Sequence, residues 1–230
     1  FNLPAGLPVW MSLVGAFIAI VIIKQLFGGL GYNFANPAIV GRIAMALGFT
    51  GAMTSYTYPE NGIDALASAT PLAVEETAQN AGSYVTLLLG NHGGVLGETC
   101  AITLLIGGIY LIWTKVISPT IPVTYLATVA VFSLLCGYDP IYQLLSGGLM
   151  LGAFFMATDY VTSPTTTKGK IVFGLGLGVI TCAIRFLGTM NEGVSFAILL
   201  MNLLVPYIEI LTRQDRLGIA KTKKKEGAAK

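Results

Sequence analysis

Residues 28–37 of this chain have the sequence GGLGYNFANP, in which three glycines and a proline interrupt an otherwise apolar run. Inside a bilayer such a break leaves backbone groups without partners, and it is tolerated only where it is buried in protein or lines a cavity. A second glycine pair, Gly147-Gly148, lies in a hydrophobic segment that ends in the polar residues 157–162. Paired broken segments are typical of membrane proteins built from repeats, where they mark a binding site. The equally weighted alternative is that the two glycine pairs arose by chance in a chain with 28 glycines.

The composition indicates an integral membrane protein. Hydrophobic residues make up 54% of the chain and charged residues 10%, and the mean hydropathy is +0.75. These values lie outside the usual range of soluble domains. The net charge of +2 does not indicate nucleic-acid binding, because seven of the thirteen Lys and Arg residues lie after Leu211.

The hydrophobic segments predict an all-α polytopic membrane protein. A helix needs about 20 apolar residues to cross the hydrocarbon core. Seven segments are candidates on that scale: 9–27, 36–53, 95–117, 121–137, 141–158, 170–187 and 192–211. We therefore predict a transmembrane domain over residues 1–211, followed by a basic tail over residues 212–230.

The distribution of charge predicts the orientation of these spans. Lys and Arg are absent between Arg42 and Lys115, whereas the loop 54–94 carries four acidic residues. By the positive-inside rule this loop lies outside, and the basic tail is cytoplasmic. Lys24 and Arg42 are then expected to flank a cytoplasmic turn. Because the chain starts outside, without Met or a basic leader, we expect further transmembrane helices to precede Phe1.

The outer loop contains the most informative polar motif. Residues 64–72 have the sequence DALASATPL, which resembles the flavinylation motif at which a dedicated transferase esterifies FMN to a threonine. In that motif an Asp is followed by two variable residues, a Ser or Thr, a small residue and Ala-Thr. Asp64, Ser68, Ala69 and Thr70 keep this spacing, while Ala67 stands where Ser or Thr is usual. The alternative is an ordinary turn at Thr70-Pro71.

Several ordered motifs extend the resemblance over nearly the whole chain. The sequence is similar to the D subunits of the Rnf complexes, which are membrane ferredoxin:NAD oxidoreductases, and to the related B subunits of the sodium-pumping NADH:quinone oxidoreductases. The matching motifs are residues 24–31, 33–37, 69–72, 151–155, 158–159, 174–178 and 202–206.

This resemblance implies two flavins. The first is FMN in a phosphoester bond to Thr70, and the second is riboflavin, bound non-covalently on the cytoplasmic side with Asn33 and Asn36 among its contacts. Asn36 is equally suited to cap the helix that begins at Pro37. Asp159 is a candidate for flavin contact or cation entry, and a cap or an ion pair with Lys168 is the alternative. The three cysteines stand singly, without metal-binding spacing, and no catalytic residue is predicted.

The function that the resemblance implies is electron carriage within a redox-driven Na⁺ or H⁺ pump of the bacterial or archaeal cytoplasmic membrane. The implied partners are a second FMN-bearing subunit, soluble subunits that handle ferredoxin and NAD, and the FMN transferase. The implied fold is the larger part of a ten-helix, two-repeat bundle like that of urea channels. The alternatives are a transporter or channel without a redox role, and the quinone-reductase counterpart of the same subunit.

Overall fold

The structure is a computed structural model that describes residues 2–60, 64–68, 82–90, 92, 94, 95, 97–188 and 193–213. Its hydrophobic part is helical, as predicted. The elements in chain order are α1 (Val9–Phe17), the π-helical η1 (Ile18–Gln25), α2 (Pro37–Gly48), α3 (Thr50–Thr54), β1 (Tyr56–Glu60), β2 (Asp64–Ser68), α4 (Gly82–Leu89), α5 (Ala101–Trp113), α6 (Thr120–Leu135), α7 (Pro140–Leu145), α8 (Leu149–Leu151), the π-helical η3 (Gly152–Met156), α9 (Thr167–Leu187) and α10 (Val194–Leu211).

Each of the seven predicted segments contains helix in the structure. Within the described residues, α9 and α10 are long and apolar enough to cross a membrane by themselves. Four shorter apolar helices lie at Val9–Gln25, Pro37–Gly48, Ala101–Trp113 and Thr120–Leu135. The helical class is therefore confirmed, whereas the number of spans and the two-repeat architecture stay predictions.

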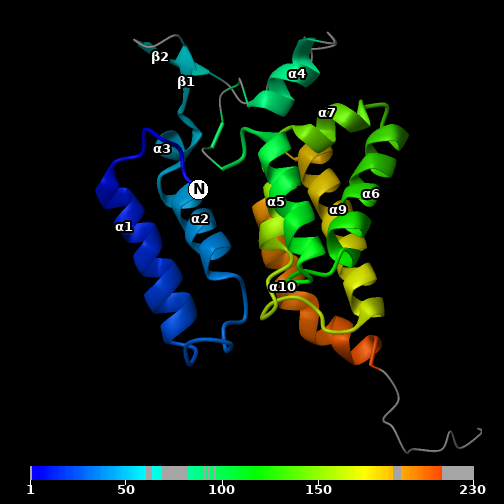
Figure 1. The fold of residues 1–230 in the computed structure, drawn as a ribbon. Coiled ribbons are helices and arrows are strands. Elements are labelled where there is room, and N and C mark those ends of the chain that lie inside the picture. The colour runs from blue at the N-terminus through cyan, green and yellow to red at the C-terminus, as the bar shows by residue number, and fades with distance from the viewer. Residues whose placement is uncertain are drawn as a thin grey trace, which may run out of the picture.

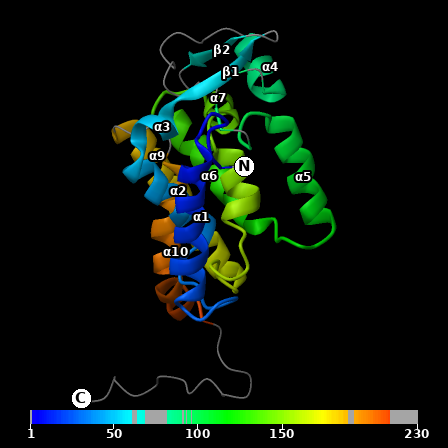
Figure 2. The same ribbon diagram turned by 90° about the vertical axis from the view of Figure 1, so that its left-hand side faces the viewer.

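The helices form a bundle with a helical pair beside it. Helices α5, α6, α7, α9 and α10 make up the bundle, and α1 with α2 stands next to it (Figure 1). The β1–β2 hairpin and α4 lie at one end of the molecule, and the C-terminal end of α10 lies at the other (Figures 1 and 2). Ile39 and Ile43 of α2 nevertheless belong to the same hydrophobic core as α6, α9 and α10.

Glycines bring α9 into close contact with both of its neighbours. A Cβ at Gly174 or Gly178 would overlap with Thr124 or Thr128 of α6, respectively. A Cβ at Gly176 would lie 2.6 Å from the Met201 Cε of α10. Small residues at helix contacts let backbones approach closely, which compensates for the weak hydrophobic drive between helices in lipid. The alternating glycines 174–178 therefore place α9 between α6 and α10.

Both sequence breaks are breaks in the helices. Between η1 and α2, Gly28 and Gly29 adopt φ angles of 114° and 89°, which side chains with a Cβ rarely accept. Gly147 adopts a φ of 66° and separates α7 from α8. Helix α7, α8 and η3 thus form one discontinuous helix over residues 140–156, which is called the discontinuous helix below.

The loop 54–94 contains a hairpin that the sequence did not predict. Strands β1 and β2 pair antiparallel, with Tyr56 opposite Ser68 and Glu60 opposite Asp64. Small residues dominate β2, and alanine and serine carry little strand propensity. The hairpin follows α3 directly and lies at the end of the molecule (Figure 2).

Candidate functional site

The predicted FMN site lies only partly within the described residues. Asp64 and Ser68 are the first and last residues of β2, at the end of the molecule opposite the C-terminal end of α10 (Figure 1). Ala69 and Thr70 lie outside the described residues. The strand therefore ends two residues before the threonine that the motif singles out.

A hydrogen bond connects this end of the molecule to the discontinuous helix. The Tyr84 hydroxyl of α4 donates to the Asp139 Oδ2, and the Asp139 Oδ1 accepts from the Ile141 backbone N–H at 3.0 Å. Asp139 is thus both the N-cap of α7 and the acceptor for α4. The hydrogen bond to this carboxylate raises the pKa of Tyr84 above its usual 10.0, because ionisation would place two anions side by side.

Asn36 caps α2, which confirms the alternative stated for it. Its Oδ1 accepts from the Ala38 N–H at 3.0 Å, with Pro37 in the first helical position. Its Nδ2 donates to the Met156 carbonyl at 3.5 Å. Asn33 makes a local bond instead, from its Nδ2 to the Ala35 carbonyl at 3.0 Å. Asn36, in the first break, therefore contacts the discontinuous helix at Met156, its last helical residue.

Asn202 of α10 joins this contact, and no role was predicted for it. With its amide oriented to suit both neighbours, its nitrogen donates to the Thr162 carbonyl and its oxygen accepts from the Asn36 N–H, each at 3.2 Å. Asn202 is 3% exposed. The available signal was an amide in an apolar helix four residues before Pro206, which cannot donate to the Asn202 carbonyl. Residues 36, 156, 162 and 202 are called the inner junction below.

Asp159 lies next to the inner junction in a local turn. It accepts from the Val161 N–H at 3.3 Å and from the Thr162 hydroxyl at 3.1 Å. The structure shows the turn and, among the residues it describes, no ion pair between Asp159 and Lys168. Asp159 therefore stabilises a local turn instead of capping a helix, since Thr166 is the N-cap of α9. A role toward flavin or cation stays a prediction.

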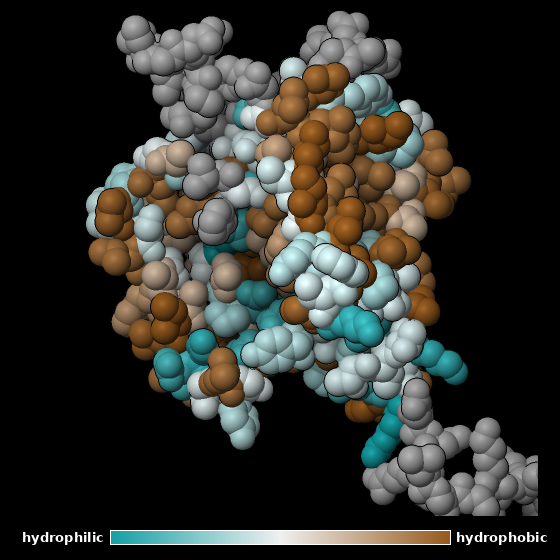
Figure 3. Space-filling model, in the orientation of Figure 1, coloured by the Kyte–Doolittle hydropathy of each residue, from teal (hydrophilic) through white to brown (hydrophobic). Residues whose placement is uncertain are grey.

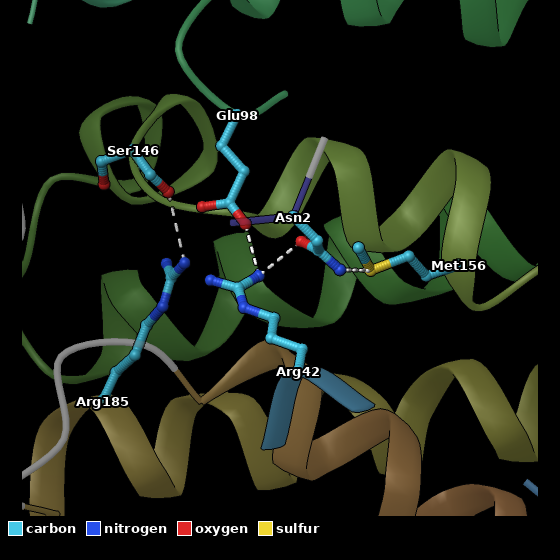
Figure 4. A network of polar contacts seen from close by, with 6 residues as sticks. All are labelled: Asn2, Arg42, Glu98, Ser146, Met156 and Arg185. Atoms are coloured by element: carbon cyan, nitrogen blue, oxygen red, sulfur yellow. Dashed lines mark hydrogen bonds and ion pairs between the residues drawn. The ribbon is translucent and has the colours of Figure 1, made fainter. Parts of the chain in front are cut away.

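A buried ion pair joins α2 to the segment before α5. The Arg42 Nη1 lies 2.5 Å from the Glu98 Oε1 and donates to the Asn2 Oδ1 at 2.7 Å (Figure 4). Arg42 is 8% exposed and Glu98 is 4% exposed. Arg42 was expected to flank a cytoplasmic turn. The structure places it six residues after Asn36 inside α2, where it faces a carboxylate, and the side of the membrane stays a prediction. The sequence offered no signal for a partner 56 residues away.

The same region contains the break in the discontinuous helix. Arg185 of α9 donates to the Gln143 carbonyl at 2.8 Å and to the Ser146 carbonyl at 3.2 Å, at the C-terminal end of α7 (Figure 4). The Glu98 Oε1 would lie 2.7 Å from a Cβ at Gly148, the residue before α8. A cation thus faces the C-terminal end of one half-helix and an anion faces the start of the other, as the helix dipoles favour.

Broken helices that meet at polar contacts, inside a largely apolar bundle, are typical of helical membrane proteins. The chain belongs to the NQR2, RnfD, RnfE family, whose profile it matches over residues 1–218. The resemblance drawn from the motifs is thereby confirmed.

Three relatives illustrate the match. The chain is 47% identical to the D subunit of the Na(+)-translocating ferredoxin:NAD(+) oxidoreductase complex of Acetobacterium woodii, over 99% of this chain and 73% of the relative. It is 42% identical to the D subunit of the proton-translocating complex of Clostridium ljungdahlii, over 94% of this chain and 71% of the relative. It is 37% identical to the D subunit of the ion-translocating oxidoreductase complex of Alcanivorax borkumensis, over 94% and 72%. The names of the first two relatives differ in the cation, which is Na⁺ for one and the proton for the other.

Proposed function

We propose that this chain is a membrane subunit of an ion-translocating ferredoxin:NAD⁺ oxidoreductase, the D subunit of an Rnf complex. The observation that carries this proposal is the 47% identity over 99% of the chain to a subunit with that function. As one subunit it has no complete catalytic cycle. Soluble subunits that handle ferredoxin and NAD⁺, together with a second FMN-bearing subunit, complete the complex.

The outer loop is the proposed site of covalent FMN on Thr70. The Asp64 to Thr70 spacing supports this assignment, as does the place of β2 at the end of the molecule (Figure 1). A phosphoester holds the cofactor by its phosphate and leaves the ring for electron transfer, the chemistry that a flavin supplies when bound. Attachment requires an FMN transferase, which is a proposed partner.

The inner junction is the proposed neighbourhood of a second flavin, riboflavin. Asn33 fits a contact to the ring edge, because only its nitrogen is used in a bond to Ala35 among the described residues. Asn36 fits a positioning role better, since its side chain caps α2 and reaches the Met156 carbonyl. Asp159, bonded to Thr162 of the junction, remains a candidate for flavin or cation contact. These residues would orient the ring and keep its polar edge paired.

The proposed orientation of the chain in the membrane uses the two opposite ends of the molecule. The hairpin and the end of α10 lie at opposite ends of the bundle (Figure 2). We propose that the loop 54–94 faces outward and the tail 212–230 faces the cytoplasm, because the acidic and basic residues divide in that way. The seven segments then cross the membrane, as part of the ten-helix, two-repeat bundle that the resemblance implies.

The covalent site is tested by flavin fluorescence of the denatured chain in a gel. The native chain, Thr70→Ala and Ser68→Ala are each expressed with an active FMN transferase. We expect fluorescence from the native chain and from Ser68→Ala, and none from Thr70→Ala. Equal fluorescence from all three would place the flavin elsewhere. Its absence from all three would remove the covalent cofactor and favour a transporter or channel without a redox role.

A second candidate is the quinone-reductase counterpart, because the family includes NQR2. The two functions differ in their electron partners. Membranes that contain the complex should reduce NAD⁺ with reduced ferredoxin if the Rnf proposal is right. Oxidation of NADH by a quinone without any reaction with ferredoxin would instead identify the counterpart.

A further inference from the structure

Helix α2 makes polar contacts at two levels beside the discontinuous helix. At the inner junction, Asn36 donates to the carbonyl of Met156, the last residue of η3. Six residues further along α2, about 9 Å at 1.5 Å per residue, Arg42 pairs with Glu98, which covers Gly148 at the start of α8. Helix α2 is therefore bonded directly to the end of the half-helix α8–η3 at Met156, and at the other level it reaches the start of α8 only through Glu98.

The contact between Arg42 and Glu98 is costly if its role is only structural. Burying a carboxylate and a guanidinium removes both from water, and the attraction between them often fails to compensate. Charged residues within membrane segments are rare and mark functional sites more often than scaffolding. Arg185 already satisfies the carbonyls at the end of α7, so the break itself does not require Arg42. The Arg42–Glu98 pair therefore calls for another role.

The pair lies where α2 meets the bundle. Hydrophilic residues gather in the hollow between the α1–α2 pair and the bundle (Figure 3). Arg42 belongs to α2, whereas Glu98 belongs to the segment that leads into α5 of the bundle, so their bond closes this interface. Asn2 adds a further bond by accepting from Arg42 while its own amide contacts the Met156 sulfur at 3.9 Å (Figure 4).

We propose that the Arg42–Glu98 pair is a positioning pair that couples ion movement to electron transfer. With the pair formed, α2 is held against the break and the polar interface between α1–α2 and the bundle is closed. Ion movement requires the pair to open, while Asn36 and Asn202 keep the inner end of α2 in place. The inference rests on the proposed ion-translocating function and requires neither flavin assignment.

The test compares ion uptake with electron transfer in the same inverted membrane vesicles that contain the whole complex. Reduction of NAD⁺ by reduced ferredoxin measures electron transfer. Uptake of radioactive sodium and quenching of a pH-sensitive dye measure ion movement. The variants are Glu98→Gln, Arg42→Gln and the apolar double variant Arg42→Met/Glu98→Leu. The matched control is Thr103→Val, because Thr103 lies close to Glu98 in sequence and bonds locally to the Cys100 carbonyl.

The apolar double variant is decisive because it removes both charges together. A pair with only a structural role is replaced by apolar residues without loss. We expect the double variant to assemble and to keep at least half of the electron transfer rate. We also expect its ion uptake per NADH to fall at least fivefold, with Glu98→Gln changed in the same direction and Thr103→Val unchanged.

The other outcomes overturn the inference. Native ion uptake per NADH in the double variant would assign the pair to structure alone. A parallel loss of both activities, or failure of every variant to assemble, would assign it to folding. If the unmodified complex itself transfers electrons without moving either ion, the proposed function fails, and the inference fails with it.

Discussion

Helix α9 and helix α2 are held in the molecule by opposite means. Helix α9 contacts α6 and α10 through glycines, so that backbones and short side chains meet with almost no free space. Helix α2 shares the apolar core through Ile39 and Ile43, and it is fixed in register by polar bonds at Asn36 and Arg42. A glycine contact has one geometry, whereas a polar bond can open and exchange partners. The tight glycine contact of α2, at Gly41, is with α1. We therefore expect α6, α9 and α10 to form a rigid unit, and α2 to move against it together with α1.

The largest expected effect comes from filling a glycine contact of α9. In Gly178→Ala the new methyl would overlap with the Thr128 Cβ, which no side-chain rotation can move away. We expect a loss of about 1–3 kcal/mol in stability, as for other overpacked cores, seen as a lower unfolding midpoint in detergent. The control is Gly48→Ala, where nothing lies within 4 Å of the added Cβ. Equal midpoints for the two variants would show that α9 is packed no more tightly than α2.

An intermediate effect is expected at the inner junction. Asn202→Leu keeps the side-chain size but leaves the Thr162 carbonyl and the Asn36 N–H without their partner. Leaving a buried group unpaired costs about 1–3 kcal/mol. This cost lowers the free energy of local opening at the start of α2 and not that of unfolding the bundle, so hydrogen exchange there should accelerate. Asn33→Ala is the control, because it removes only the local bond to Ala35. If exchange in Asn202→Leu matches the native protein, α10 does not hold α2 at this end.

The sequence predicted the helical segments and the two breaks because their causes are local. Apolar runs of sufficient length specify helices in a membrane, and glycine clusters such as 28–31 specify the turns between them. The N-cap at Asn36 followed from its place directly before Pro37. The Asp64 to Thr70 motif was identified from its resemblance to the flavinylation sequence and stays a prediction, because Thr70 lies outside the described residues.

The contacts that build the site could not be predicted, because they join residues far apart in the chain. Arg42 and Glu98 are 56 residues apart and lie on elements whose relative position depends on the whole bundle. The charge pattern placed Arg42 beside a cytoplasmic turn, because that rule counts charges and says nothing of their partners. The amide of Asn202 likewise acquires its meaning only when α2 and α10 meet.

The smallest expected effect concerns the bond between α4 and the discontinuous helix. The Asp139 carboxylate raises the pKa of Tyr84, so the stabilisation from this bond is present below pH 10.0 and is lost as the pH rises through the raised pKa. Asp139→Asn keeps the cap on α7 but removes the charge, and it should lower the pKa of Tyr84 toward its usual value. Ultraviolet titration of the native and Asp139→Asn proteins, each minus its own Tyr84→Phe version, isolates this phenol. Identical titrations would mean that Tyr84 does not bond to Asp139 and that α4 does not contact α7. Among the helices compared, only α2 would then be held by polar bonds.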